Sequence, residues 1–119
     1  MNKAKKRVNL RYDNNPLAYV ADSAIHGRGL FARRAIKPDD YIGTYRGKPT
    51  QTNGMHVLWL WNDERERWEG IDGKNEMRFL NHSNEPNADW WGDELFALRP
   101  IARDEEITFD YGWDEEEED

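Results

Sequence analysis

Residues 78–87 read Arg-Phe-Leu-Asn-His-Ser-Asn-Glu-Pro-Asn, and this stretch constrains the fold more than any other part of the chain. Its polar half combines an Asn-His pair with a Ser and further Asn residues, side chains that offer both hydrogen-bond donors and acceptors. Pro86 fixes its own φ angle and biases Glu85 towards extended geometry. The segment therefore cannot be an ordinary amphipathic helix or strand. It predicts a tight, hydrogen-bonded corner that presents polar groups to a ligand.

Two further segments carry a related signal, one on each side of this corner. Residues 26–32 read His-Gly-Arg-Gly-Leu-Phe-Ala, where two glycines one residue apart permit positive φ and close approach of the backbone to a ligand. Residues 104–113 read Asp-Glu-Glu-Ile-Thr-Phe-Asp-Tyr-Gly-Trp, a strand-like run that ends in an aromatic residue before a glycine. The ordered set of three segments is far more specific than a lone Gly-x-Gly.

The set resembles the SET-domain family of protein lysine methyltransferases, over about residues 18–113. The family's patterns are roughly G-x-G, then R-F-x-N-H-S-x-x-P-N, then E-E-x-T-x-D-Y, and residues 41–47 resemble the strand after the first. The resemblance implies a mainly β fold, the β-clip arrangement of several small sheets, with a C-terminal segment threaded under a loop like a pseudoknot. This threading would place the Asn81-His82 corner beside residues 109–111. The chain departs from the family at Asn84, where Cys is frequent.

Strand-like runs also dominate the chain independently of the resemblance. Short apolar or aromatic runs alternate with Gly, Pro and Asn-Gly breakers, a pattern typical of β-proteins. The expected strands lie at residues 17–21, 29–32, 41–45, 57–61, 94–98 and 106–109. A single short helix is expected at residues 74–80, after the Asp72-Gly73 turn. This pattern alone predicts a small sandwich or barrel.

Length and composition bound the class of protein. A chain of 119 residues has the size of one domain and can bury roughly two thirds of its unfolded surface. Hydrophobic residues make up only 37% of it, so six Trp, five Tyr and four Phe must supply much of the core. Cysteine is absent, which excludes disulfides, thiolate metal sites and the cysteine-rich zinc segment that often follows a SET domain. We expect no metal, no membrane-spanning segment and, without a signal-peptide pattern, an intracellular protein.

Charge is concentrated at the two ends of the chain. Residues 114–119 are six consecutive carboxylates, which leave only −1 of the formal net charge of −7 to the rest. The other end is basic, through Lys3, Lys5, Lys6 and Arg7. We expect a flexible basic N-terminus (1–16), a SET domain (17–113) and an acidic tail (114–119). The tail is either a solubilising segment or one that attracts basic substrates. A near-neutral body argues against specific nucleic-acid binding.

The resemblance implies a protein-lysine N-methyltransferase that uses S-adenosylmethionine, acts on a histone or another basic protein or peptide, and is a monomer or homodimer. Such a reaction depends on positioning the methyl group and the amine on one axis. The amine must be neutral, and an apolar aromatic channel lowers its pKa from about 10.4 by desolvation. The alternative is a non-catalytic module of the same fold that binds lysine or methyl-lysine in a Trp-rich cage.

The same resemblance assigns the site residues. Tyr111 is the expected catalytic residue, with its hydroxyl directed at the reacting centre, and Asn81 and His82 are expected to hold the cofactor. The remaining expected cofactor contacts are Gly27, Arg28, Gly29, Leu30, Tyr45, Tyr111 and Trp113. The lysine channel is expected to use Phe109 and some of Trp59, Trp90 and Trp91, each of which has the core as its alternative place. A Phe at position 109 predicts a di- or trimethylated product.

Overall fold

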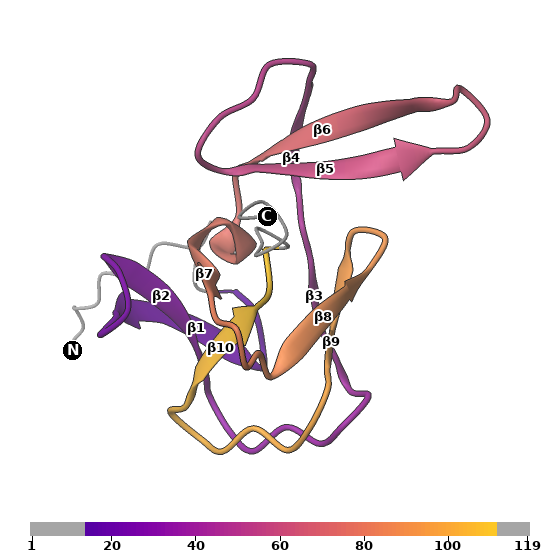
Figure 1. Ribbon diagram of the computed structural model, residues 1–119. Helices are drawn as coiled ribbons and strands as arrows, with labels where there is room; N and C mark the ends of the chain where they lie inside the picture. The colour runs from indigo at the N-terminus through magenta and orange to yellow at the C-terminus, as the bar shows by residue number, and fades with distance from the viewer. Residues whose placement is uncertain (1–13, 112–119) are drawn as a thin grey trace, which may run out of the picture.

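The computed structural model describes residues 14–111, which form three small sheets and one short helix (Figure 1). The elements in chain order are β1 (Ala18–Asp22), β2 (Arg28–Ala32), β3 (Tyr41–Thr44), β4 (Gly47–Thr50), β5 (Val57–Asn62), β6 (Arg67–Gly73), the 3-10 helix η1 (Glu76–Phe79), β7 (Asn81–His82), β8 (Ala88–Trp91), β9 (Glu94–Ala97) and β10 (Glu106–Phe109). The sheets have strand orders β1-β2-β10-β7, β3-β9-β8 and β4-β6-β5. The predicted mainly β fold of several small sheets is therefore confirmed.

Each of the six expected strands is present within about two residues of its predicted bounds, as β1, β2, β3, β5, β9 and β10. Four strands were missed, and β6 shows why. Its sequence is charged and contains Gly70, yet it lies between β4 and β5 and pairs with both. A Cβ atom at Gly70 would lie 2.9 Å from both the Thr50 carbonyl oxygen and a Val57 methyl group. The glycine is therefore what lets this strand sit between two neighbours.

The expected helix is a single 3-10 turn rather than an α-helix across residues 74–80. Asn75 occupies its N-cap position without a side-chain capping hydrogen bond, and strand β7 begins directly after Leu80. Too few residues remain between β6 and β7 for two α-helical turns. Among residues 14–111, no helix has the length and apolar character needed to span a bilayer.

The hydrophobic core lies between the first two sheets. Its largest fully buried apolar side chains come from strands β2, β9 and β10, from η1 and from the Ile36–Ile101 bridge; they are Leu30, Ile36, Met77, Leu95, Ile101 and Ile107. Burying such a side chain contributes roughly 1.5–3 kcal/mol of transfer free energy. The β4-β6-β5 sheet extends away from this body in Figure 1, with Leu58 and Ile71 packed against the core.

Asn15, from the segment expected to be a flexible N-terminus, makes several hydrogen bonds in the described structure. Asn15 is buried, and its side-chain amide donates hydrogen bonds to the Ile42 carbonyl (3.0 Å) and to the Glu76 carboxylate (2.9 Å). Its own Oδ1 accepts from the main-chain N–H of Leu17 at 2.7 Å. These bonds tie Asn15 to strand β3 and to η1. The acidic tail and the basic residues 3–7 lie outside the described residues.

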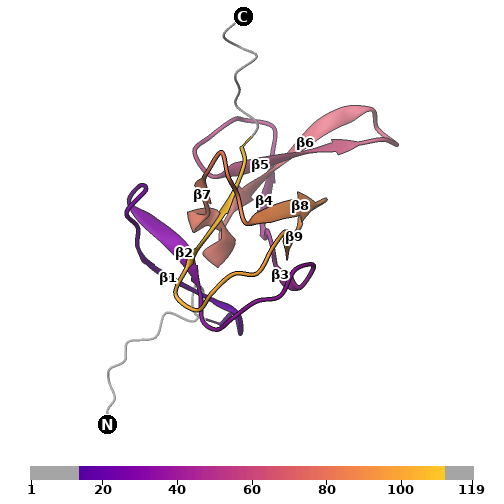
Figure 2. The same ribbon diagram turned by 60° about the horizontal axis from the view of Figure 1, so that its bottom comes forward.

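Strand β10 lies between β2 and β7, and this placement brings the sequence motifs together (Figures 1 and 2). It runs antiparallel to β2, with Ile107 opposite Leu30. It runs parallel to the two-residue β7, with Thr108 opposite Asn81 and Phe109 opposite His82. The predicted meeting of the Asn81-His82 corner with residues 109–111 is therefore confirmed.

Candidate functional site

Five aromatic side chains form a continuous chain of ring contacts beside β7 and β10. The rings of Tyr45 and Trp90 pack edge-on with their centroids 5.7 Å apart, and those of Trp90 and Phe109 pack edge-on with their centroids 5.6 Å apart. The ring centroids of Phe109 and Tyr111 lie 4.6 Å apart, and those of Tyr111 and His82 lie 5.1 Å apart. Such edge-on packing suits aromatic quadrupoles and makes a rigid apolar wall. The structure thus unites the predicted catalytic Tyr with two of the four predicted channel residues.

Tyr111 is held by its main chain and by its hydroxyl. The hydroxyl donates a hydrogen bond to the Leu80 carbonyl oxygen at 3.1 Å, and the main-chain N–H donates to Nδ1 of His82 at 3.0 Å. Because its ring is partly withdrawn from water, burial raises the pKa of the Tyr111 phenol. The phenol is therefore neutral near pH 7, with its hydrogen committed to Leu80.

His82 links Tyr111 to the polar corner. Its Nδ1 accepts the hydrogen bond from Tyr111, which places a ring hydrogen on Nε2, 2.9 Å from Oδ1 of Asn84. Asn84 can accept this hydrogen, whereas a thiol at the same position would be a weak acceptor. Asn84, where the family frequently has Cys, therefore provides a hydrogen-bond acceptor for His82 in this chain.

The Asn81 side chain connects the corner to the Gly-x-Gly segment. Its Nδ2 lies 3.1 Å from the carbonyl oxygens of both His26 and Arg28. The same nitrogen lies 3.2 Å from the Ser23 hydroxyl and 2.9 Å from a Glu106 carboxylate oxygen. Two amide hydrogens shared among four acceptors fix the loop that carries the glycines. Asn81 is only 8% exposed, so these bonds are shielded from water.

Ser23 and Glu106 are site residues that the sequence reasoning did not single out. The Ser23 hydroxyl lies 2.8 and 2.9 Å from the two Glu106 oxygens, and that carboxylate also faces Asn81 and Gly29. Glu106 is the second Glu of the E-E pair, which was a usable signal for it. Ser23 had none, since a Ser before a Gly-x-Gly segment is ordinary turn chemistry.

The other predicted cofactor residues take different places around this corner. Leu30 is fully buried in the core, and the exposed Arg28 holds its guanidinium 5.4 Å from the centre of the Phe79 ring. Tyr45 is buried, donates its hydroxyl hydrogen to the His56 carbonyl, and has its pKa raised by desolvation. Trp113 lies outside the described residues.

The three candidate Trp residues occupy different environments in the structure. Trp90 faces the core and the aromatic chain, and its buried Nε1 has no hydrogen-bond partner among residues 14–111. Trp91 is 80% exposed on the opposite face of β8. Trp59 lies on β5, where its indole N–H donates to Oδ1 of Asn53 at 3.1 Å. Only Trp90 therefore adjoins Phe109.

Between residues 14 and 111, no three His, Asp or Glu side chains gather in a way that could hold a metal ion.

Comparisons with known proteins bear on the same segments. The sequence model of the SET domain matches residues 27–112. The chain is 32% identical over 129 residues to "Histone-lysine N-methyltransferase MEDEA" of Arabidopsis thaliana, covering 89% of this chain and 18% of that protein. It is 34% identical over 121 residues to human "Histone-lysine N-methyltransferase 2B", covering 77% of this chain and 4% of that protein. The chain thus spans less than a fifth of the length of these curated relatives.

A solved structure agrees at the level of fold. The methyltransferase domain of human "Histone-lysine N-methyltransferase SETMAR" superimposes with a TM-score of 0.67 at 23% sequence identity, covering 79% of this chain and 44% of that one. The matched region contains all three motifs that meet at Asn81, Tyr111 and the Gly-x-Gly segment. The chain belongs to the SET-domain family.

Proposed function

We propose that the chain is a protein-lysine N-methyltransferase that uses S-adenosylmethionine as its methyl donor. One observation carries the proposal: the Tyr111 hydroxyl, the Trp90–Phe109 wall and the loop tied by Asn81 converge on one corner of the fold. The relatives named above are histone-lysine enzymes, which supports lysine in a basic protein as the acceptor and an intracellular setting. The subunit number, monomer or homodimer, stays open.

The chemistry of the corner fits this donor. S-adenosylmethionine bears two positive groups, a sulfonium and an ammonium, and the corner gathers oxygen acceptors: the carbonyls of His26, Arg28 and Leu80 and the Glu106 carboxylate. Each carbonyl has a second lone pair beyond the bond it makes in the protein. We assign the donor's carboxylate to the main chain of Gly27–Leu30 and the Arg28 guanidinium, and its adenine to the His82 main chain. When bound, it supplies a methyl group on a sulfur that leaves as a neutral thioether.

Tyr111 then acts by positioning the amine. Its hydrogen is donated to Leu80, and in the proposed reaction its phenolic oxygen accepts an N–H of the substrate amine. A hydrogen bond of this kind aims the nitrogen lone pair and costs no proton transfer. The raised pKa of the phenol excludes it as a base near pH 7. The lysine proton is lost to solvent before attack, helped by desolvation against Phe109 and Trp90.

Labelled-methyl transfer in the presence of a metal chelator tests the proposal. The purified chain should bind S-adenosylmethionine in calorimetry and label lysines of histones, ribosomal proteins or its own sequence. Absence of labelling in all three, together with absence of cofactor binding, would overturn the proposal. Binding of lysine peptides without cofactor binding would favour the non-catalytic module.

Asn81→Ala is expected to weaken cofactor affinity. The substitution removes the donor shared by His26, Arg28, Ser23 and Glu106, so the loop loses the bonds that fix its carbonyls. Leaving shielded acceptors unpaired costs about 1–3 kcal/mol, which corresponds to roughly 5- to 150-fold in affinity if the bound state bears it. Calorimetric titration of the variant measures this. Unchanged affinity would show that Asn81 does not form the cofactor site.

Phe109→Tyr is expected to shift the product from di- or trimethyl-lysine towards monomethyl-lysine. The amine must rotate after each transfer, and a new hydroxyl on this ring would hold it by a hydrogen bond. The Phe109 ring already contacts Trp90 and Tyr111, so the added oxygen enters a crowded wall. Mass spectrometry of the product at excess cofactor measures the shift. A wild-type product that stays monomethylated at long times would implicate Trp90 as the group that crowds the channel.

A further inference from the structure

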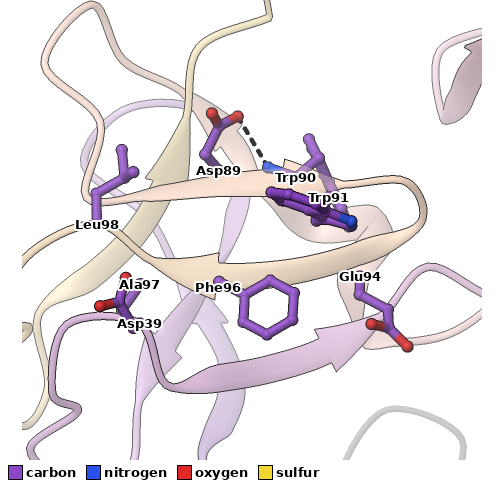
Figure 3. A pocket seen from close by; sticks show the side chains of 8 residues that line it. All are labelled: Asp39, Asp89, Trp90, Trp91, Glu94, Phe96, Ala97 and Leu98. Carbon is purple, nitrogen blue, oxygen red and sulfur yellow. Dashed lines mark hydrogen bonds between the residues drawn. The ribbon is translucent and has the colours of Figure 1, made fainter.

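The outer face of the β3-β9-β8 sheet carries an open depression of about 450 Å³ (Figure 3). It is lined by Asp39, Asp89, Trp90, Trp91, Glu94, Phe96, Ala97 and Leu98. Figure 3 shows the Trp91 and Phe96 rings across its middle, with Asp39 and Leu98 towards one end and Glu94 at the other. Neither Asn81 nor Tyr111 lines it, whereas Trp90 does, and the ring of Trp90 also packs against Phe109.

Strand register explains why these groups share one face. Asp89 pairs with Phe96 and Trp91 pairs with Glu94 across β8 and β9, and cross-strand partners project to the same side of a sheet. Tyr41 on β3 extends the row, because its ring meets that of Phe96 edge-on at 5.7 Å. Trp91 is 80% exposed. A contiguous apolar surface of this kind on a small domain marks a contact site.

The charge of the depression is one-sided. Asp39, Asp89 and Glu94 are exposed carboxylates, and none forms an ion pair with another residue in the described part of the chain. Neither Lys nor Arg from residues 14–111 lines the depression. Carboxylates beside an exposed indole are what a guanidinium or ammonium group binds, by charge-assisted hydrogen bonds and by stacking on the ring.

We propose that this face docks an arginine- or lysine-rich segment of the substrate protein, away from the lysine that is methylated. The inference rests on the proposed function, which makes the substrate a basic protein. Trp90 connects this face to the aromatic wall, because it lines the depression and its ring packs against Phe109. Since an extended chain spans about 3.3 Å per residue, a segment roughly ten residues from the target lysine can reach the depression. The face thereby adds affinity for long basic substrates without touching the reacting groups.

Fluorescence anisotropy tests the docking with a probe that cannot be methylated. The probe is a fluorescein-labelled (Arg-Ala-Ser)₆ peptide, which contains no lysine, titrated with the full chain in the absence of cofactor. Asp89→Lys/Glu94→Lys should weaken binding about tenfold more than the control Asp63→Lys/Glu64→Lys, which makes the same charge change at the exposed β5–β6 turn. Trp91→Ala should weaken it about three- to tenfold through loss of stacking.

Equal losses in the docking and control pairs would reduce the effect to net charge and overturn the proposal, as would no binding by the wild type. Concentration-dependent self-association that Asp89→Lys/Glu94→Lys abolishes would assign the face to a second copy instead. In turnover, the docking pair should raise KM about tenfold for a 40-residue basic peptide. It should leave kcat, and KM for an eight-residue peptide around the same lysine, unchanged. Because the probe assay needs no methyl transfer, it distinguishes a failure of docking from a failure of the proposed activity.

Discussion

Tyr111→Phe is expected to lower the rate of methyl transfer by about 10²–10³-fold, the usual effect of removing one preorganised hydrogen-bonding group at a reacting centre. The ring contacts with Phe109 and His82 do not involve the hydroxyl, and the main-chain bond to His82 persists. Cofactor affinity should therefore stay within about twofold. The Leu80 carbonyl loses its donor, which lowers the free energy of unfolding by about 1 kcal/mol. Single-turnover kinetics with calorimetric cofactor binding separates these effects.

Tyr19→Phe is the matched control, because its hydroxyl donates to Asp104, outside both the aromatic chain and the docking face. It removes the same atom and should leave the rate unchanged. Equal rates in Tyr111→Phe and the wild type would remove Tyr111 from the reaction.

The pH profile provides a second measurement on the same residue. Burial raises the pKa of Tyr111, so more than half of its phenol keeps its proton throughout the range from pH 7 to its ordinary value of about 10. The rate should rise across this range as the substrate amine loses its proton, with no falling limb from Tyr111. A decline below pH 10 that disappears in Tyr111→Phe would contradict the neutral, positioning role.

The sequence predicted the meeting of the motifs because the family resemblance specifies long-range topology that local pattern does not. Propensity alone indicated a sandwich or barrel and could not place Asn81 beside Phe109. Adjacent residues show the remaining limit. Trp90 and Trp91 are adjacent residues of the same type, yet successive side chains of a strand point to opposite faces of the sheet. Which Trp enters the wall was decided by the β8 register and by packing against Phe109, and neither is a local property.

Contacts between residues far apart in the sequence could not be predicted from local patterns either, because they depend on which strands pair. Ser23 and Glu106 lie 83 positions apart, and their hydrogen bond exists because β10 pairs with β2. The 3-10 turn at Glu76–Phe79 was anticipated as a helix, since local propensity does not register that β7 begins directly after it.

The two glycines of the first motif lead to the second large effect, because the structure treats them differently. A Cβ atom on Gly29 would fall on a Glu106 carboxylate oxygen, 2.9 Å from Cδ of that residue and 3.1 Å from Nδ2 of Asn81. Glu106 cannot swing away without losing its bonds to Ser23 and Asn81. Gly27 has a φ of +49°, but nothing lies within 4 Å of its missing Cβ.

Gly29→Ala is therefore expected to weaken cofactor affinity by about 5- to 150-fold, the equivalent of the roughly 1–3 kcal/mol that overpacking costs. Gly27→Ala meets only the backbone cost of left-handed φ, about 1–2 kcal/mol of stability, and should change affinity by less than about fivefold. Calorimetric titration and thermal unfolding of both variants measure the contrast. Repeating Gly29→Ala in a Glu106→Ala background identifies the cause, because removing the obstructing carboxylate should recover most of the added loss. Equal losses with and without Glu106 would mean that Gly29 is needed for direct approach of the ligand to the backbone.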